Sequence, residues 1–377
     1  MAQASFWEKN SFYSGQDIII IGSGFVGLWS ALQLNRRNPE LNITIIDRGS
    51  IPTGASTRNA GFSCFGSPSE LLTDAMQMGA DKMWKLVKMR YDGLQTIRSY
   101  FNPSQIGFDP SGGYECFLED SEDWQLTREK LAWLNKGMEA ITGITDTFRH
   151  DNQLLSQFGF NGFDHIVAND LEGGVQPGLL IQQLTQYIQQ RGVQVLYGMA
   201  AERFVQDDKE VVLEMENGIR MTCKQLLLCT NAFTPDLIPE IDIIPCRGQV
   251  FITAPIPGLK IKGTFHFDKG YYYFRNVGDR LLIGGARNSD FEGETTPEIA
   301  ITDQIQDELH RFVQRHLLPD TPFDITDRWS GIMAMGAEKM PLVHALGSNV
   351  FCCVRMSGMG VALAPVVADH VAELMLG

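Results

Sequence analysis

The chain has 377 residues and a formal net charge of −14, because 45 acidic side chains outnumber 31 basic ones. A negative chain is repelled by nucleic-acid backbones and by anionic membrane surfaces, so its charge argues against both as partners. With 44% hydrophobic residues and no low-complexity tract, the sequence is typical of a globular protein and excludes a disordered one. The length allows two or three domains.

Seven cysteines are scattered along the chain without a C-x-x-C pair, which indicates neither a disulfide framework nor a zinc site. We therefore expect no metal. The adjacent Cys352 and Cys353 lie in an apolar stretch and are interpreted as buried strand residues. Residues 1–16 lack the features of a signal peptide, and no apolar run reaches the length of a membrane span. We expect a reduced, cytoplasmic protein.

A strand, a glycine-rich turn, a helix and a second strand are predicted over residues 17–47. Four consecutive isoleucines suit a strand that is buried on both faces, as in a parallel sheet. The helix is predicted from Phe25 to about Asn35, and the second strand over residues 42–47. This β-α-β unit is half of a dinucleotide-binding fold.

Gly22, Gly24 and Gly27 occupy the turn with the spacing G-x-G-x-x-G. The first permits a tight turn, the second lets the backbone approach a pyrophosphate, and the third allows close packing of helix on strand. The N-terminus of the helix offers N–H groups and a positive dipole end to the phosphates. Asp47 ends the second strand, where it can accept hydrogen bonds from an adenosine ribose. This motif alone does not distinguish NAD from FAD.

The following segments alternate between helical and strand patterns. Residues 49–68 are predicted to form a polar loop, residues 69–101 and 122–139 helices, and residues 112–118 a strand. A second αβ unit begins near Pro177, its helix ends at Gly192, and a strand covers residues 193–196. Strands forming a β-meander are predicted over residues 203–206, 211–216 and 220–229.

The last third of the chain contains a predicted hairpin of residues 271–275 and 280–285, an amphipathic helix over 297–318, a strand over 349–354 and a helix over 361–376. This order implies a discontinuous two-domain protein. We assign residues 1–103, 176–235 and 326–377 to a nucleotide-binding domain, and residues 104–175 and 236–325 to a substrate domain.

One further segment, Gly54–Phe62, reads G-A-S-T-R-N-A-G-F. It closely resembles the G-A-S-x-R-N-x-G segment of the D-amino acid oxidase and glycine oxidase superfamily of FAD enzymes. The resemblance extends over most of the chain, through residues 176–195, 228–233, 245–249, 329–331 and 357–365. It implies an α/β fold (α+β overall) with a Rossmann-like FAD-binding domain of the glutathione-reductase type and an inserted antiparallel-sheet substrate domain.

The resemblance also implies which residues contact the cofactor. These are Gly22, Ser23, Gly24, Phe25, Val26, Gly27, Asp47, Arg48, Ala55, Ser56, Thr57, Arg58, Asn59, Ala60, Gly61, Ala201, Cys229, Thr230, Asn231, Gly331, Ser357, Gly358, Met359, Gly360, Val361 and Ala362. Ala201 would hold the adenine side through its backbone, and Asn231 stands where the family usually has glycine. The turn at residues 357–360 enters a helix whose positive end suits the anionic edge of a reduced flavin.

Two methionines depart from the family pattern. Glycine and D-amino acid oxidases place an arginine for the substrate carboxylate where this chain has Met333. The hairpin and the turn at residues 357–360 look more like those of γ-glutamylputrescine oxidase and related amine oxidases, although Met359 replaces the usual histidine. Sarcosine-oxidase-like relatives anchor flavin through a cysteine near residues 329–341, and this sequence has none there, so we expect non-covalent FAD.

The function implied by the resemblance is oxidation of the C–N bond of a small amine or amino acid, with hydride transfer to flavin N5 and hydrolysis of the imine. Oxygen or another carrier would accept the electrons. His266, Tyr273 and Arg275 are the catalytic candidates, because the resemblance puts their strands over the flavin. Arg275, Arg287 or Arg355 could bind an anionic group. An NAD(P)-dependent dehydrogenase and an accessory flavoprotein without amine oxidation remain as alternatives.

Overall fold

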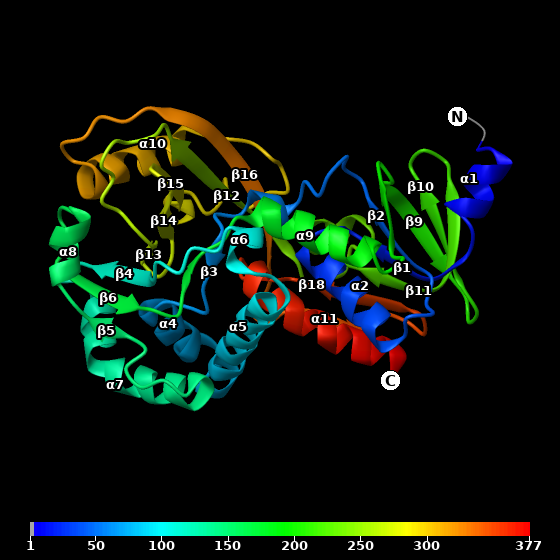
Figure 1. Ribbon diagram of the computed structural model, residues 1–377, viewed down its shortest axis with the longest axis horizontal. Helices are drawn as coiled ribbons and strands as arrows, with labels where there is room; N and C mark the ends of the chain where they lie inside the picture. The colour runs from blue at the N-terminus through cyan, green and yellow to red at the C-terminus, as the bar shows by residue number, and fades with distance from the viewer. Residues whose placement is uncertain (1–3) are drawn as a thin grey trace. The chain divides into compact units, whose positions relative to one another are not determined.

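The computed structural model describes residues 4–377, which form two compact units (Figure 1). Unit 1 contains the chain up to Thr57 together with Gly178–Cys246 and Met333–Gly377. Unit 2 contains Arg58–Pro177 and Arg247–Ile332. No helix within residues 4–377 is long and apolar enough to cross a membrane.

Unit 1 is built on a mainly parallel sheet of eight strands. Its main path has the order β17-β18-β11-β1-β2-β8, in which only the β17–β18 pair is antiparallel. These strands are β1 (Gln16–Ile21), β2 (Ile43–Asp47), β8 (Gln194–Tyr197), β11 (Arg220–Leu228), β17 (Leu342–Ala345) and β18 (Val350–Val354). Two antiparallel strands, β9 (Ala201–Gln206) and β10 (Val211–Met215), extend β11 into the predicted meander.

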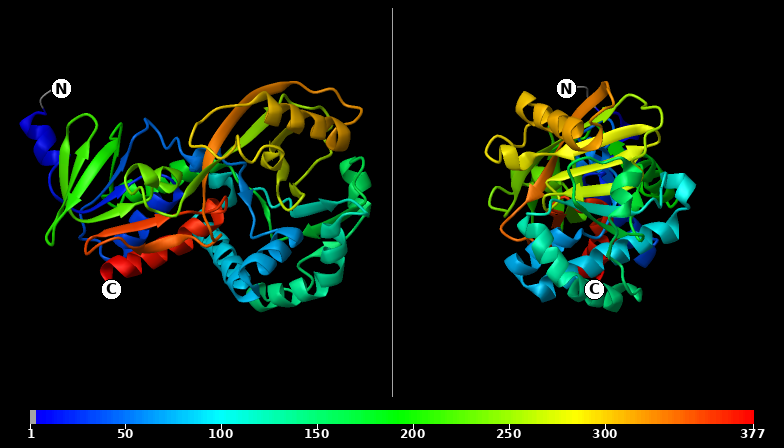
Figure 2. Two further views of the ribbon diagram at one scale, coloured as in Figure 1. Left: turned by 180° about the vertical axis from the view of Figure 1, so that it is seen from behind. Right: turned by 90° about the vertical axis from the view of Figure 1, so that its left-hand side faces the viewer.

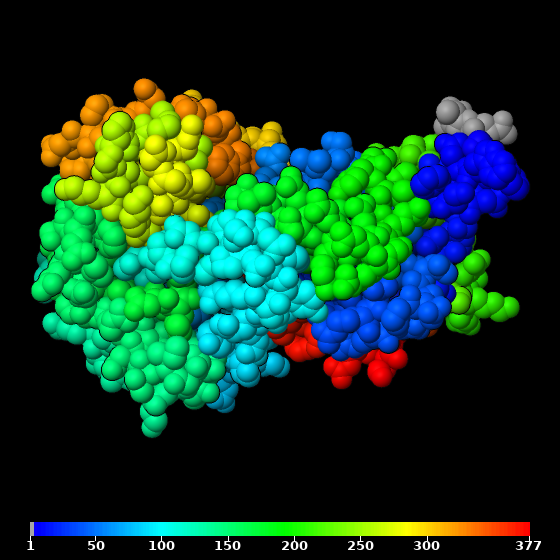
Figure 3. All heavy atoms as spheres, in the orientation of Figure 1, coloured from blue at the N-terminus to red at the C-terminus, as the bar shows by residue number. Residues whose placement is uncertain are grey.

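The helices of unit 1 bury the apolar faces of this sheet. Two of them, α2 (Phe25–Arg37) and α11 (Gly360–Leu376), pack against each other and against the strands (Figure 1). The isoleucines of β1 and the cysteines of β18 are buried, as the sequence predicts. The other helices are α9 (Pro177–Gln189) and the short α1 (Phe6–Ser11), which has no buried residue and lies at the surface (Figure 3).

Unit 2 contains most of a second sheet with the order β16-β12-β15-β14-β13-β4-β6-β5; the start of β12 and the end of β16 belong to unit 1. Its strands are β4 (Gly113–Phe117), β5 (Arg149–His150), β6 (His165–Asn169), β12 (Ile244–Thr253), β13 (Thr264–Phe267), β14 (Tyr272–Val277), β15 (Arg280–Gly285) and β16 (Ile325–Met335). The run β12-β15-β14-β13 is antiparallel, as is β4-β6-β5, and β13 pairs in parallel with β4. A mixed α/β fold with one mainly parallel and one mainly antiparallel sheet is thus confirmed.

Aromatic side chains and helices complete unit 2. Its core contains Phe251, Phe265 and Phe274, against which α10 (Asp303–Phe312) packs beside β15 (Figure 2). The remaining elements are α3 (Ala55–Arg58), which begins in unit 1, and α4 (Pro68–Met78), α5 (Ala80–Tyr100), α6 (Pro103–Ile106), α7 (Glu122–Thr142), α8 (Gln153–Phe158), β3 (Phe62–Ser63) and β7 (Gly173–Gly174).

Three features differ from the predictions. The helix predicted over residues 297–318 begins only at Asp303, because Gln249 binds the backbone N–H of Thr302 at 3.0 Å and its hydroxyl at 2.8 Å, holding it extended. The helical region 69–101 is divided at Gly79, whose φ of +87° ends α4. Residues 58–103, assigned from the sequence to the nucleotide-binding domain, belong to unit 2, where α4 and α5 pack with α7. The functional roles of the two domains remain a prediction.

Candidate functional site

The glycine turn after β1 is closed so tightly that Gly22 and Gly27 leave no room for a side chain. Gly22 has a φ of +107°, and a Cβ atom there would lie 2.8 Å from the carbonyl oxygen of Cys229. A Cβ atom on Gly27 would lie 1.9 Å from the carbonyl oxygen of Gly22. The N-terminus of α2 therefore approaches the end of β1 through backbone atoms alone. Its N–H groups and dipole form a site for an anion such as a pyrophosphate.

Ser56 lies at this same helix end. Its Oγ accepts a hydrogen bond from the backbone N–H of Phe25 at 2.9 Å. A Cβ atom on Gly24 would come within 2.8 Å of that Oγ, so Gly24 is needed for the serine to reach the helix. The predicted cofactor residues Gly24, Phe25 and Ser56 are thus brought together, although they come from two segments of the sequence.

Asp47 ties the end of β2 to the glycine turn. Its Oδ2 accepts from the backbone N–H of Ser23 at 2.8 Å and from the Ser23 hydroxyl at 2.6 Å, and its Oδ1 accepts from the Gly49 N–H at 2.9 Å. A carboxylate has about four acceptor positions, so one remains for a ribose hydroxyl. Ribose binding remains a prediction. Nearby in the sequence, Arg48 stacks over the ring of Phe233 at 3.8 Å.

A second backbone turn of unit 1, at residues 355–358, is strained. Arg355 and Ser357 have φ values of +64° and +47°, which non-glycine residues seldom adopt. Asn231 supports the turn: its Oδ1 accepts from the Arg355 N–H at 3.1 Å and from the Met356 N–H at 3.4 Å. Asn231 itself has a φ of +48°, and asparagine is the residue that best replaces glycine there.

Ser357 offers a polar atom that finds no hydrogen-bond partner in the described part of the chain. Within residues 4–377, its Oγ is buried and makes no hydrogen bond. The side chain lies just before α11, whose first N–H groups have no partner within the helix. Together with the glycine turn at α2, these groups fit a dinucleotide cofactor that carries negative charge on its phosphates and, once reduced, on its reacting ring.

The predicted cofactor segment of unit 2, Arg58–Gly61, is held by hydrogen bonds of its backbone and of the Arg58 side chain. Trp329 donates its Nε1–H to the Arg58 carbonyl at 2.9 Å, and the Arg58 guanidinium donates to the Ser330 carbonyl at 2.9 Å. A Cβ atom on Gly331 would lie 3.0 Å from the Cβ atom of Arg58. The predicted residues Arg58 and Gly331 are therefore in direct proximity.

Two of the three catalytic candidates lie around one aromatic ring. The ring centroid of Phe62 is 5.1 Å from that of His266 and 5.9 Å from that of Tyr273. Burial lowers the pKa of His266 to about 4 and raises that of Tyr273 to about 12. Both side chains are consequently uncharged at neutral pH. Their catalytic role remains a prediction.

Arginines that could bind an anionic substrate are largely engaged by the protein itself. The Arg355 guanidinium pairs with the carboxylate of Asp242 and donates to the Met340 carbonyl at 3.0 and 3.1 Å. Arg275 donates to backbone carbonyls of unit 2. Arg287 lies over the ring of Phe291 at 4.9 Å.

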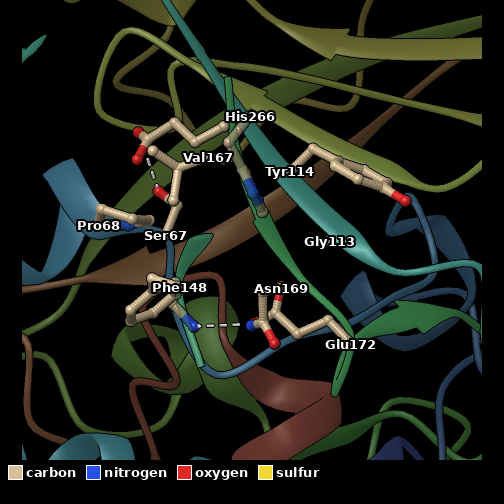
Figure 4. A pocket seen from close by; sticks show the side chains of 11 residues that line it. Ser67, Pro68, Gly113, Tyr114, Phe148, Val167, Asn169, Glu172 and His266 are labelled. Carbon is tan, nitrogen blue, oxygen red and sulfur yellow. Dashed lines mark hydrogen bonds between the residues drawn. The ribbon is translucent and has the colours of Figure 1, made fainter. Parts of the chain in front are cut away.

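Two buried glutamates were not among the residues predicted from the sequence. Glu115 and Glu172 line a small cavity of unit 2, into which His266 and Asn169 also point (Figure 4). The cavity has room for about one water molecule, and Asn169 Nδ2 is a buried donor without a partner among residues 4–377. Burial raises the pKa of each carboxyl to about 7. The available signal was an acidic residue inside the apolar strand Gly113–Phe117.

Within residues 4–377, no group of three or more histidine, cysteine, aspartate or glutamate side chains is arranged to hold a metal ion. The seven cysteines are free thiols, and all except Cys64 are buried.

Comparison with known proteins agrees with this geometry. A family model described as DAO, FAD dependent oxidoreductase, matches residues 17–374. The chain is 24% identical to gamma-glutamylputrescine oxidoreductase of Escherichia coli K12, over 96% of this chain and 84% of that protein. It is also 24% identical to a probable oxidoreductase of Rhizobium meliloti, over 96% of this chain and 83% of that protein.

Solved structures share the fold. An L-proline dehydrogenase from P. horikoshii superimposes with a TM-score of 0.78 and 18% identity, covering 97% of this chain and 94% of the other. Glycine oxidase from Bacillus cereus gives a TM-score of 0.75 and 15% identity, covering 96% and 94%. The family model spans both units and includes the glycine turn, the Arg58–Gly61 segment and the strained turn before α11. The chain therefore belongs to the DAO family of FAD-dependent oxidoreductases, and FAD is its cofactor.

Proposed function

We propose that this chain oxidises the C–N bond of an amine that lacks an α-carboxylate, with non-covalent FAD as the oxidant. The observation that carries the proposal is the uncharged surface formed by Phe62, His266 and Tyr273, which belong to strands that the sequence resemblance assigns to the flavin face. FAD supplies, when bound, a two-electron acceptor for a hydride from the carbon next to nitrogen. Water then hydrolyses the imine product.

The chain's own residues would select the reactive form of the substrate. An amine must be neutral to release hydride from its α-carbon, and uncharged neighbours do not stabilise an ammonium ion. His266, with a pKa of about 4, and Tyr273, with a pKa of about 12, stay neutral between those values. The aromatic side chains would also help to exclude water from the reacting carbon.

A methionine in place of the family's carboxylate-binding arginine supports an amine over an amino acid. Met333 stands where related amino acid oxidases have an arginine. The guanidinium groups of Arg275 and Arg355 are bound by backbone carbonyls and, for Arg355, by Asp242. The similarity to gamma-glutamylputrescine oxidoreductase agrees with an amine substrate, whereas L-proline dehydrogenase and glycine oxidase, which share the fold, would favour an amino acid.

The test is anaerobic reduction of the bound flavin, followed by its absorbance, with a panel of polyamine conjugates, D-amino acids and N-methyl amino acids. We expect amines without an α-carboxylate to bleach the flavin. Bleaching by amino acids alone would refute the substrate class. A flavin that no amine bleaches would favour the accessory flavoprotein, and the family match already argues against the nicotinamide-dependent alternative.

Two further properties are tested with the same protein. Admitting air to the reduced enzyme shows whether oxygen accepts the electrons. Heat denaturation should release FAD into the supernatant, because no cysteine lies within residues 329–341. Flavin that stays with the denatured protein would contradict non-covalent binding. The cytoplasmic location remains a prediction.

A further inference from the structure

We propose that Arg275 is a positioning residue, whose guanidinium holds the backbone at Gly61 and thereby fixes the segment Arg58–Phe62 for contact with the flavin. The inference rests on the proposed cofactor role of that segment. It changes the role expected for Arg275 from catalysis to support of the site.

The hydrogen bonds of Arg275 connect three separate parts of unit 2. Nη1 donates to the carbonyl oxygen of Gly61 and, at 2.9 Å, to that of Val175, while Nε donates to the Asn276 carbonyl at 3.0 Å. The strand β14 thus holds the start of β3 and the end of β7 through one side chain. The Val175 N–H also donates to the Gly61 carbonyl at 2.8 Å, so this oxygen accepts from two directions.

The backbone leaves a space that only the guanidinium occupies. A Cβ atom on Gly174 would lie 2.3 Å from both Cζ and Nη2 of Arg275. A Cβ atom on Gly61 would lie 2.9 Å from Nη1 and 2.2 Å from the Val175 carbonyl oxygen. Two glycines therefore admit the planar fork of the arginine, which a side chain at either position would displace.

The other end of the segment is held independently. At that end, Trp329 donates to the Arg58 carbonyl at 2.9 Å. Gly61 itself also donates its N–H to the Asn59 side chain at 2.8 Å. From β14, the Arg275 guanidinium donates to the Gly61 carbonyl of this segment, while Phe62 pairs with Gly174 of β7. Without Arg275, Gly61 keeps its hydrogen bonds to Val175 and Asn59 but loses the one that connects it to β14. Removal of Arg275 should therefore loosen Gly61 and Phe62 while the Trp329 contact remains.

The buried charge of Arg275 would destabilise the folded protein if its hydrogen bonds were not made. The residue is 7% exposed, and burial lowers its pKa to about 10, against the opposing effect of Asp109. It still carries a proton at neutral pH, and it makes no ion pair among residues 4–377 within 4.0 Å. Backbone carbonyls are therefore its main compensation.

The experiment compares Arg275→Met and Arg275→Lys with the wild type, using FAD titration of the apoprotein, the visible spectrum of bound flavin, and kcat against KM. We expect Arg275→Met to bind FAD about 10-fold more weakly and with an altered spectrum, because several bonds to a charged donor are lost. Lysine keeps the charge but not the fork, so Arg275→Lys should lie between the two.

Arg280→Met is the matched control, because Arg280 lies on the same hairpin and donates to the Thr253 carbonyl at 2.9 Å, away from the cofactor segment. It should keep wild-type FAD affinity. Wild-type affinity and spectrum in folded Arg275→Met would overturn the proposal, and if that variant does not fold, the same result in Arg275→Lys would overturn it. Neither FAD readout depends on amine oxidation, so failure of the wild type to oxidise amines is a separate outcome.

Discussion

Replacement of Glu115 by glutamine should stabilise the protein at pH 8 and have little effect at pH 5. Glu115 is 1% exposed on β4. Its Oε2 accepts from the Ser69 N–H at 2.9 Å, and its Oε1 accepts from the hydroxyls of Ser69 and Ser67, the latter at 3.1 Å. Glutamine can keep the amide oxygen at the Oε2 position, and the two hydroxyls can rotate to accept from its NH2 group.

The expected magnitude follows from the pKa of Glu115. Burial raises it from 4.5 to about 7, even though the hydrogen bonds from Ser69 and Ser67 lower it. Between pH 4.5 and about 7, Glu115 is therefore protonated in the folded protein but ionised in the unfolded chain. The free energy of unfolding falls as the pH rises through this window, by about 3 kcal/mol in total. At pH 5 the free energy of unfolding is lowered by less than about 1 kcal/mol.

Other titratable groups that line the same cavity also change how the stability of the wild type depends on pH. Glu172, with a pKa of about 7, acts in the same direction as Glu115. His266 acts in the opposite direction, because its pKa of about 4 in the folded state makes stability rise with pH up to about 6.5. The difference between variant and wild type at each pH isolates the contribution of Glu115.

The assay is equilibrium urea denaturation at pH 5 and pH 8, with excess FAD at one fixed concentration because ligand binding shifts apparent stability. Glu139→Gln, on the exposed side of α7, is the matched control for the loss of one negative charge. Glu115→Gln should gain up to about 3 kcal/mol relative to wild type at pH 8. An equal difference at the two pH values, or a loss at pH 8, would refute the reasoning.

Three substitutions in unit 1 test the predicted cofactor-binding site. Gly27→Ala places a Cβ atom 1.9 Å from the Gly22 carbonyl oxygen and should displace α2, so the purified protein should retain less flavin per chain. Asp47→Ala removes the acceptor that holds the glycine turn and should weaken FAD binding about 10-fold in a titration; unchanged affinity would contradict this role. Asn231→Ala removes the oxygen that accepts from two backbone N–H groups and places alanine at a φ of +48°. Asn231→Gly loses the same oxygen but tolerates this φ, so the melting temperature of Asn231→Ala should be the lower of the two.

The features that sequence predicted well depend on local patterns. Residues 17–47 contain the isoleucine run of β1, the glycine spacing and the acid at the end of β2. These features are close in the sequence, and Asp47 accepts a hydrogen bond from the backbone of the glycine turn. The hairpin of β14 and β15 is local as well. Such elements are encoded by periodicity and turn chemistry, which are visible in a short window of sequence.

Features that depend on distant residues were not predictable in the same way. Gln249 lies 53 residues before Thr302 and sets the start of α10. Arg275 reaches carbonyl groups 100 and 214 residues away, which no spacing rule indicates. Its residue type suggested an anion site, whereas its partners are neutral oxygens. The type of a residue therefore limits its chemistry, and the tertiary structure decides which part of that chemistry is used.

A net charge of −14 is compatible with an anionic cofactor, because such a cofactor can be bound without basic side chains. In unit 1 the groups suited to the cofactor are backbone N–H groups at the start of α2 and α11, together with hydroxyls of Ser56 and Ser357. These groups are dipoles whose direction is fixed by the fold, so they stabilise negative charge without adding positive residues. An acidic chain can thus repel nucleic acids and still hold a dinucleotide. For this fold, the direction of a helix is more informative about the cofactor than the sum of the charges.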